Sequence, residues 1–537
     1  MANEQIPVNV VGSSVFGRYP KVNSEKTFNM FVSDDWLVNT PGYKKRLNIV
    51  STTSQAKGRG LFHSVKGDFL IAVVNAGVYR ISRNLSPIFL GNIGTTSGEV
   101  SIAENLNKQI CIVDGQKAYI YNWLTLAFGE AVPATAFPFT PSYVDYQNTY
   151  FLFTSQPYDT NPSKWYAYQS GFLLDPVTAA DALKLTAVTN GDKAISTKSD
   201  NTVAIKRIPG RGNNVLVFGS SVAEVWTDVG GADVYRRVQS FNVDSGCVSR
   251  DTIAANDQYV VWVGKNEHNA PAIMVSDGSS FESFSTDGIS HLMQTVTRPQ
   301  DSTAFFFRQD GHLFYAVTFY ADDDNFTIFF DFNTKKFYNL SDEYMNFFPC
   351  RQIAFFKEKT YFVSLRDQGL YELSTDILNY SYEIDEDDLG QQIPRVRVCK
   401  TIRKKDSSPF RINNFQFWIE QGYDTEFLVN NESGLYCQGL MITEPGVDFI
   451  VSEDDEPLLA EDGICVENNL RPRVDMSYSK NGAAYFGTTN GVYLNSNGHY
   501  HNRISWHRMG RANEFTVQLR FWGFQRFAVN DGVVEVT

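Results

Sequence analysis

The chain has 537 residues, of which 43% are hydrophobic and 14% aromatic, and its formal net charge is −13. This length exceeds one ordinary hydrophobic core, so we expect two or three domains. The excess of acids argues against broad, tight binding of a DNA backbone, which needs clustered Lys and Arg. No stretch approaches the roughly 20 apolar residues that cross a bilayer, and the first residues do not resemble a secretory signal. We therefore expect a protein that is made and folds in a cytoplasm, without membrane contact.

The 41 Phe and 27 Tyr indicate a β-rich fold, because aromatic side chains suit a pleated, half-buried surface. The cysteines form no C-x-x-C pair and are scattered along the chain: Cys111, Cys247, Cys350, Cys399, Cys437 and Cys465. In a large cytoplasmic chain such residues are free and act as small hydrophobes. Neither disulfides nor structural zinc are expected.

Residues 1–50 show no clear repeat. Within them, Asn39-Thr40-Pro41-Gly42-Tyr43 predicts a turn, because Pro presets one backbone dihedral and Gly permits the next. This first segment is either an N-terminal arm or the segment that closes the ring of repeats that follows. The sequence leaves both readings open.

Residues 51–385 repeat one pattern, in which a polar turn leads into a short apolar and aromatic strand and then into a second strand. The first example is Phe69–Val74 followed by Val78–Ile81 after the turn at Asn75-Ala76-Gly77. The leading turns fall near residues 68, 107, 148, 214, 257, 311 and 359. Units of about 40 to 50 residues built from hairpin strands are typical of propeller blades, each of which buries its faces only against its neighbours. We predict a β-propeller of seven blades, with six as the alternative count and an irregular sandwich of hairpins as the alternative fold.

The longest repeat contains an insertion near residues 168–200, because Asp175-Pro176 and the run Ala179–Leu185 interrupt the strand pattern. After the repeats, the acidic stretch Glu383–Asp388 with Gly390 predicts a linker or an exposed loop. Residues 390–537 then carry separate strand signals at 415–419, 473–479 and 515–521. Alternating apolar and polar residues in the last two imply one buried and one wetted face, so we predict a C-terminal β-sandwich.

A search for reactive chemistry finds little. The pair His499 and His501 could share one strand face and hold a metal, but no carboxylate stands at a diagnostic spacing. The acids Asp322–Asp324 and Glu453–Glu456 do not follow the alternation of a calcium loop. Nucleotide-binding and nucleophile-elbow fingerprints are missing, and no pair of acids is singled out for glycoside cleavage. We expect no catalytic residues, no cofactor and no metal, hence a protein that is not an enzyme.

Three segments of the sequence stand out as family motifs. The first segment runs from Asn213 to Trp226 and on to Ser245–Val248 and Asp257–Trp262; the second covers Tyr478–Gly482 and Asn502–Arg511; the third is Phe28–Phe31 with Thr40–Gly42. In their order and spacing they resemble one known family, the tail-hub or nozzle proteins of short-tailed bacteriophages, often called packaged DNA stabilization proteins. In the second segment His507 stands where the family usually has a basic residue. The motif residues carried by this resemblance are Phe218, Gly219, Glu224, Trp226, Gly246, Trp506, Arg508, Gly510 and Arg511.

Apart from the resemblance, the chemistry of these residues also allows ordinary structural roles. Gly219 suits a close backbone approach or a bulge. Arg503, Arg508 and Arg511, which flank Trp506, either clamp carboxylates and stack on aromatics or form common surface ion pairs around a core tryptophan.

The resemblance implies a structural virion protein: a homo-hexameric ring below the portal-adaptor ring that continues the DNA channel and retains packaged DNA. Implied partners are a tail needle or plug, tailspike or fibre proteins, and genomic DNA that passes through the lumen without sequence-specific binding. Six copies would carry a formal charge of about −78 (6 × −13), and we hypothesise that lumenal acids weakly repel phosphates so that DNA slides. Slower ejection after reversal of lumenal acids to Lys would support this idea, and unchanged kinetics would refute it. The alternatives are a receptor- or glycan-binding tail propeller and a monomeric cytoplasmic scaffold.

Overall fold

The structure is a computed structural model. It describes all of the chain except residues 1–3, 19–24, 51–55, 172–177, 179, 209, 232, 322–324, 385–389, 422–426, 431–434, 441–458, 468–471, 481, 484 and 495–500, and for the segments within 421–467 it describes only the backbone.

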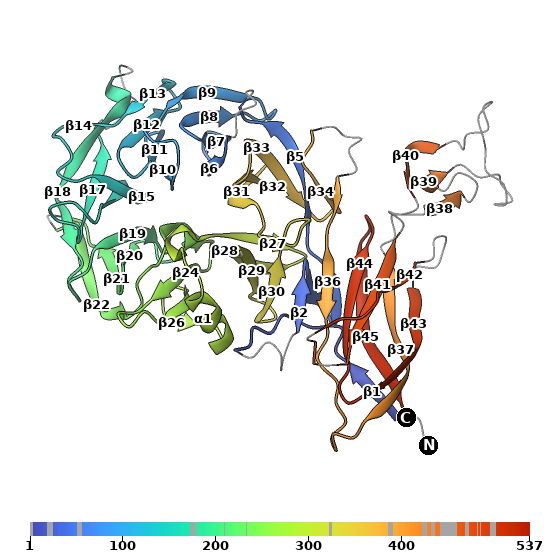
Figure 1. Cartoon of the computed structure of the whole chain (residues 1–537). Coiled ribbons are helices and arrows are strands. Elements are labelled where there is room, and N and C mark those ends of the chain that lie inside the picture. The colour runs from blue at the N-terminus through green and yellow to red at the C-terminus, as the bar shows by residue number, and fades with distance from the viewer. Residues whose placement is uncertain are drawn as a thin grey trace.

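The described residues fold almost entirely into β-strands, which form a ring of small sheets beside a two-sheet sandwich (Figure 1). This arrangement confirms the predicted all-β class with a β-propeller. Among the described residues no helix has the length and apolar character needed to span a membrane.

Seven antiparallel sheets, each with a run of four strands, make up the ring within the described part of the chain. The first strands of successive blades contact one another around the axis; for example, β31 contacts β6, and β6 contacts β10. The first strands of blades 1 to 7 are β6 (Gly58–Ser64), β10 (Ser101–Glu104), β15 (Pro141–Gln147), β19 (Thr202–Arg207), β23 (Ala254–Ala255), β27 (Thr303–Gln309) and β31 (Cys350–Phe356).

The hairpins predicted from the sequence are the second and third strands of these blades. The second strands are β7 (Phe69–Val74), β11 (Gln109–Val113), β16 (Tyr150–Ser155), β20 (Asn214–Gly219), β24 (Val260–Lys265), β28 (His312–Phe319) and β32 (Lys359–Ser364). The third strands are β8 (Gly77–Ile81), β12 (Ala118–Asn122), β17 (Lys164–Ser170), β21 (Ala223–Asp228), β25 (Pro271–Ser276), β29 (Phe326–Asp331) and β33 (Gly369–Ser374). They are almost wholly buried because neighbouring blades cover both of their faces.

The outermost strands are β9 (Pro87–Asn92), β13 (Ala127–Glu130), β18 (Lys184–Ala194), β22 (Tyr235–Val243), β26 (Phe281–Ser283), β30 (Lys336–Leu340) and β5 (Gly42–Asn48). Several of them are exposed, such as β9, whereas β30 and β5 are largely buried and pair with strands beyond the ring. Strand β18 lies within the segment 168–200 where an insertion was predicted, and it is the outer strand of blade 3, next to the short strand β14 (Val132–Pro133). The few helical turns are η1 (Asp181–Leu183), η2 (Arg250–Thr252), η3 (Pro299–Asp301) and α1 (Asp287–Gln294).

Blade 7 takes its outer strand from the start of the chain, because β5 pairs antiparallel with β33. Of the two readings open for residues 1–50, this strand fits the one that closes the ring. Tyr43 of β5 is fully buried and stacks on Tyr380 at 4.2 Å between ring centroids. Edge-to-face contacts with Phe362 and Tyr371 of blade 7 surround it. Strand β5 of the N-terminal segment is therefore held to the last blade by an aromatic cluster as well as by strand pairing.

The sandwich is continuous with blade 6. Strand β30 pairs with β2 (Lys26–Phe28), and the sheet continues through β36 (Arg395–Val398), β44 (Thr516–Trp522), β41 (Arg473–Ser479) and β42 (Asn490–Tyr493). The facing sheet contains β3 (Met30–Ser33), β4 (Trp36–Asn39), β45 (Phe527–Val536), β37 (Phe410–Gln421) and β43 (His501–Ala512), with β1 (Glu4–Val8) paired to β45. The sandwich predicted from residues 390–537 thus also contains strands from the first 50 residues, and both ends of the chain lie together (Figure 1).

Buried Arg397 fixes the N-terminal segment to the sandwich. Its guanidinium is fully buried on β36, pairs with Glu25 at 3.0 Å and donates to the carbonyl oxygens of Asn9, Val10 and Ser13. The remaining strands are β34 (Asn379–Ser381) and β35 (Gln391–Gln392) beside β5, and a separate sheet of β38 (Phe427–Asn430), β39 (Leu435–Leu440) and β40 (Leu459–Glu467).

Candidate functional site: the axial pocket

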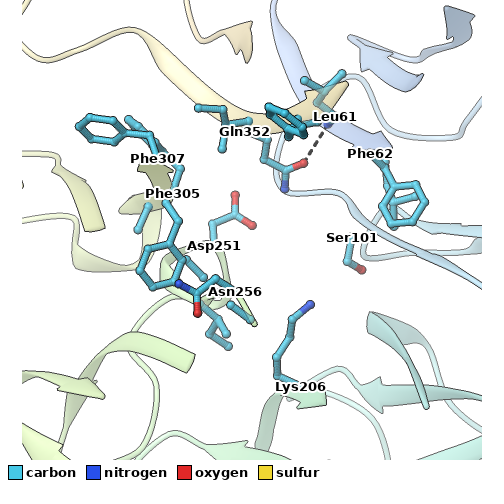
Figure 2. Close-up of a pocket in the computed structure, with 18 of the residues that line it drawn as sticks. Leu61, Phe62, Ser101, Lys206, Asp251, Asn256, Phe305, Phe307 and Gln352 are labelled. Atoms are coloured by element: carbon cyan, nitrogen blue, oxygen red, sulfur yellow. Dashed lines mark hydrogen bonds between the residues drawn. The ribbon is translucent and has the colours of Figure 1, made fainter. Parts of the chain in front are cut away.

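A cavity of about 750 Å³ lies on the axis of the ring (Figure 2). Every blade contributes to its lining from, or next to, its first strand: Leu61, Ile102, Tyr143, Lys206, Ala254, Phe305 and Ile353, in blade order. Its volume is within the range of small-molecule sites. The pocket is therefore a product of ring closure and belongs to no single blade.

Lys206 points its ammonium group into this cavity (Figure 2), which Arg250 and Arg308 also line. Its ammonium lies 3.5 Å from Asp145, and its pKa is raised to about 12, because the charge of Asp145 and neighbouring Tyr143 outweigh the burial that opposes the charged form. Opposite it, Gln352 accepts a hydrogen bond from the Leu61 backbone at 2.9 Å. The walls combine these polar groups with Phe305 and Phe307, so the pocket suits a small ligand with an acidic or hydroxyl group and an apolar face.

Short helix η2 contributes Arg250 and Asp251 to the lining of the cavity and forms ion pairs with other blades. Arg250 pairs with Glu99, before blade 2, and its guanidinium also donates to the Ser142 hydroxyl of blade 3 at 2.7 Å. Asp251 pairs with Arg351 of blade 7. Glu99 accepts a further bond from the Ser249 hydroxyl at 3.3 Å. These contacts join the start of blade 5 to blades 2, 3 and 7 beside the axial cavity.

Burial controls the titration of this network. It raises the pKa of Glu99 to about 7, with the charge of Asp251 adding to the shift and Arg250 opposing it. Arg59 at the start of β6 donates five hydrogen bonds, to the Asn75, Thr95, Ser97 and Gly98 carbonyls and to the Thr95 hydroxyl. Burial lowers the pKa of Arg59 to about 10. Each charged group here has protein partners. We call Glu99, Arg250, Asp251 and Arg351 the plug of the propeller, a structural cluster within one chain.

The motif residues of blades 4 and 5 meet at one interface. Phe218 is fully buried and contacts Trp262 edge-to-face at 5.1 Å. A Cβ on Gly219 would lie 2.4 Å from the Asp200 carboxylate, and one on Gly246 would lie 2.3 Å from the Ser220 backbone. These glycines allow blade 5 to start against the end of β20.

Glu224 is a fully buried carboxylate that accepts four short hydrogen bonds and a longer one from Arg237. The donors are the Ser196 and Thr197 amides, the Thr197 hydroxyl and the Trp226 indole, at 2.5–3.0 Å. Arg237 lies 3.4 Å away. The indole of Trp226 in turn contacts Trp165 edge-to-face at 5.5 Å. Glu224 therefore fixes residues 196–197, which precede the first strand of blade 4, to β21 of the same blade. Neither Glu224 nor Trp226 lines the axial pocket.

The C-terminal motif lies on β43. Trp506 is buried, stacks on Phe415 and donates to the Asn490 carbonyl at 3.1 Å. Gly510 has a φ of +85° at a bulge, and Arg508 and Arg511 are exposed. The motif residues thus form two separate groups, neither of which belongs to the pocket.

Of the two histidines considered for a metal, His499 lies outside the described residues, and His501 lies against Trp418 at 4.6 Å. Within the described ranges, no three His, Cys, Asp or Glu side chains gather as a metal site. Sequence reasoning missed the plug residues Glu99, Arg250, Asp251 and Arg351. They come from three separate places in the sequence, before blade 2, before blade 5 and within β31, and only the closed ring brings them together.

Comparisons with solved structures show distant likenesses. Virginiamycin B lyase from Staphylococcus aureus is 12% identical, with a TM-score of 0.40 over 62% of this chain and 99% of that one. A streptogramin B lyase is 9% identical, with a TM-score of 0.38 over 62% of this chain and 98% of that one. At such scores the likeness carries no argument about activity. No curated protein matches the chain.

The family comparison is direct. A family model described as bacteriophage P22 Gp10, β-propeller, matches residues 16–376. The match begins in the N-terminal segment and ends just after β33, so it covers all seven blades. The chain belongs to the bacteriophage P22 Gp10 β-propeller family.

Proposed function

We propose that the chain is a subunit of the tail hub or nozzle ring of a short-tailed bacteriophage. In this role six copies continue the DNA channel below the portal-adaptor ring, retain the packaged genome together with a needle or plug, and anchor tailspikes or fibres. The protein is a virion component that acts by assembly and not by catalysis. The observation that carries the proposal is the family match over residues 16–376.

The small size of the axial pocket supports a channel between subunits. The pocket holds only about 750 Å³ and is lined by side chains of all seven blades, with Arg250 and Asp251 of two inter-blade ion pairs among them. A duplex therefore has to run past the outer surfaces of several copies, which a closed cyclic assembly arranges evenly around one axis.

Electron cryomicroscopy of the whole phage particle tests this proposal. We expect six copies of a seven-bladed ring fused to a sandwich, located between the portal-adaptor and the tip of the tail. Density for the chain at the ends of host-binding fibres, or no density for it in the particle, would refute the hub role.

The axial pocket supports a second candidate, a glycan-binding tail propeller. The cavity of about 750 Å³ combines the Lys206 ammonium with phenylalanine walls, and apolar walls with a few convergent polar groups are typical of ligand sites. A glycan array with the purified chain tests it. Binding that is lost in Lys206→Met and kept in Lys335→Met, an exposed lysine of the propeller rim, would favour this candidate. No binding would exclude it for the glycans on the array.

A further inference from the structure

Four arginines lie on the outer face of one sheet of the sandwich, and none of them belongs to a propeller blade. Arg411 lies on β37, and Arg503, Arg508 and Arg511 lie on β43, and all four are exposed. We call the outer surface of these two strands the basic face. Residues 501–513 contain three arginines, two histidines and no acid, in a chain with 60 acids and 47 Lys and Arg. The β43 part of the face is thus a local reversal of the net charge, while β37 carries one described acid, Glu420, opposite His501.

These arginines lack acidic partners in the described part of the chain. No described carboxylate lies within 4.0 Å of any of the four guanidinium groups, and Arg503 bonds only to the neutral side chain of Gln416, at 3.0 Å. Elsewhere on the surface cations do pair with acids, as Lys117 does with Glu130 and Lys164 with Asp192. Within the described residues, the positive charge of the basic face is therefore not neutralised by an ion pair.

The strand register places like charges side by side. Arg411 and Arg511 are directly opposite each other across the β37–β43 pair, an arrangement that destabilises a sheet. A bulge at Ile412/Asn414 breaks the register, and there Arg508 adopts a φ of +59°. The bulge turns both His507 and Arg508 to the exposed side, because bulges redirect side chains. An anion bound between these groups would relieve their repulsion.

The shape and polarity of the face favour phosphates over a protein surface. Arg503 and Arg511 lie eight positions apart on one strand, roughly 25 Å at the usual rise per residue. Trp418 is the large apolar side chain exposed on the face, and it lies against His501. Protein interfaces usually have an apolar centre, whereas clustered arginines on one face are the signature of contact with a nucleic acid backbone.

We propose that the basic face contacts the phosphodiester backbone of the genomic duplex inside the ring. The proposal rests on the hub role and assigns a surface to it. It gives DNA an attachment point on a molecule whose net charge otherwise repels it, and it identifies the sandwich as the part of each subunit that faces the channel.

Fluorescence anisotropy with a labelled 30-base-pair duplex of random sequence, at low salt, tests the proposal on the full chain. The variant R411Q/R508Q/R511Q should weaken binding at least tenfold. It should also reduce the slope of log K against log salt by about 2 to 3, since each lost phosphate contact contributes roughly 0.9. The matched control K57Q/R236Q/K335Q removes the same charge from exposed positions on the propeller and should change binding less than twofold.

A charge-retaining variant, R411K/R508K/R511K, keeps the test valid if the glutamine variant folds poorly, and it should bind DNA nearly as well as the wild type. Equal loss in the face and control variants, or no DNA binding by the wild type at low salt, would overturn the proposal. Retained DNA binding with loss of self-association in sedimentation would also overturn it and would assign the face to an acidic protein surface.

The two proposals fail in distinguishable ways. Particles assembled with R411Q/R508Q/R511Q that hold their genome normally, together with unaltered DNA binding in solution, overturn the basic face and leave the hub role intact. Particles that lack the chain and still keep their genome and lower tail overturn the hub role, whatever the anisotropy shows.

Discussion

Glu224 illustrates how a single buried acid organises a blade. All five of the hydrogen bonds described for its carboxylate come from donors, and the side chain has no exposed surface. Glu224→Gln would place an amide donor against those donors, so we expect a loss of about 2–4 kcal/mol in the free energy of unfolding. Urea unfolding measures this loss. Glu130→Gln, at an exposed pair with Lys117, is the control and should leave stability nearly unchanged; equal effects of the two changes would contradict the assigned role.

Gly246 tests the close approach between blades 4 and 5. A methyl group there would lie 2.3 Å from backbone atoms of Ser220 and Ser221, which cannot rotate away. We expect Gly246→Ala to destabilise the chain by about 3 kcal/mol or more. Gly212→Ala is the matched control, since nothing lies within 4 Å of its Cβ position. A melting temperature for Gly246→Ala equal to that of the control would show that the approach is not tight.

The titration of Glu99 gives the plug a pH dependence. Its native pKa of about 7 lies above the ordinary value of 4.5, chiefly because of burial. The native state therefore holds the proton more tightly, so the contribution of Glu99 to stability is full below its ordinary pKa and is lost as the pH rises through about 7.

The Glu99→Gln side chain is neutral at every pH, so it lacks this loss. The free energy of unfolding of the variant, relative to that of the wild type, should therefore rise by about 2 kcal/mol between pH 5 and pH 8. Denaturant unfolding at both pH values, with the wild type and the variant side by side, measures this difference. Parallel profiles would mean that Glu99 is ionised in the plug over the whole range.

At the scale of elements, closure of the ring depends on strand β5. Its partners in blade 7 are more than 300 residues away in the chain, as in the pair Gly42 and Ser374. Tyr43→Ala removes the central ring of the aromatic cluster on this strand. We expect it to cost about 3–5 kcal/mol and to raise hydrogen exchange selectively in β31–β33. Tyr158→Ala, at a side chain 71% exposed, should do neither; uniform exchange across all blades would argue that β5 does not close the ring.

The middle strands of the blades were predictable from the sequence, because burial on both faces makes them continuous apolar runs such as Phe69–Val74. The outer strands were not, since solvent exposure leaves a segment such as Pro87–Asn92 without an apolar pattern. Strands β1 and β2 were missed for another reason. Their partners, including Val536 for Glu4 and Val396 for Phe28, lie far along the chain, and no local pattern encodes such pairing.

The basic face and the plug also differ in how far the sequence alone could predict them. The arginines of β43 were visible as a motif, but whether they pair with acids depends on the fold, and the described part of the structure leaves their charges without a carboxylate partner. The plug residues Glu99, Arg250, Asp251 and Arg351 gave no signal, because each is an isolated charge until the ring closes.

At the scale of the whole molecule, the propeller and the sandwich form one continuous unit. The sheet of blade 6 runs through β30 and β2 into the sandwich, and one hydrophobic cluster extends from Phe314 and Phe362 of the propeller to Phe415 and Val534 of the sandwich. A subunit built in this way presents the blades and the basic face in a fixed relation. A ring of such subunits needs no hinge within each copy to enclose a channel.

The central claim is that this chain forms the part of the tail that retains the packaged genome. The most direct test is electron microscopy of particles from a phage with a stop codon in this gene, with encapsidated DNA quantified in the same preparation. We predict heads that package DNA but lose it, and that lack the lower tail. Full particles that keep their DNA and fail only to adsorb to the host would contradict the claim and favour a receptor-binding propeller.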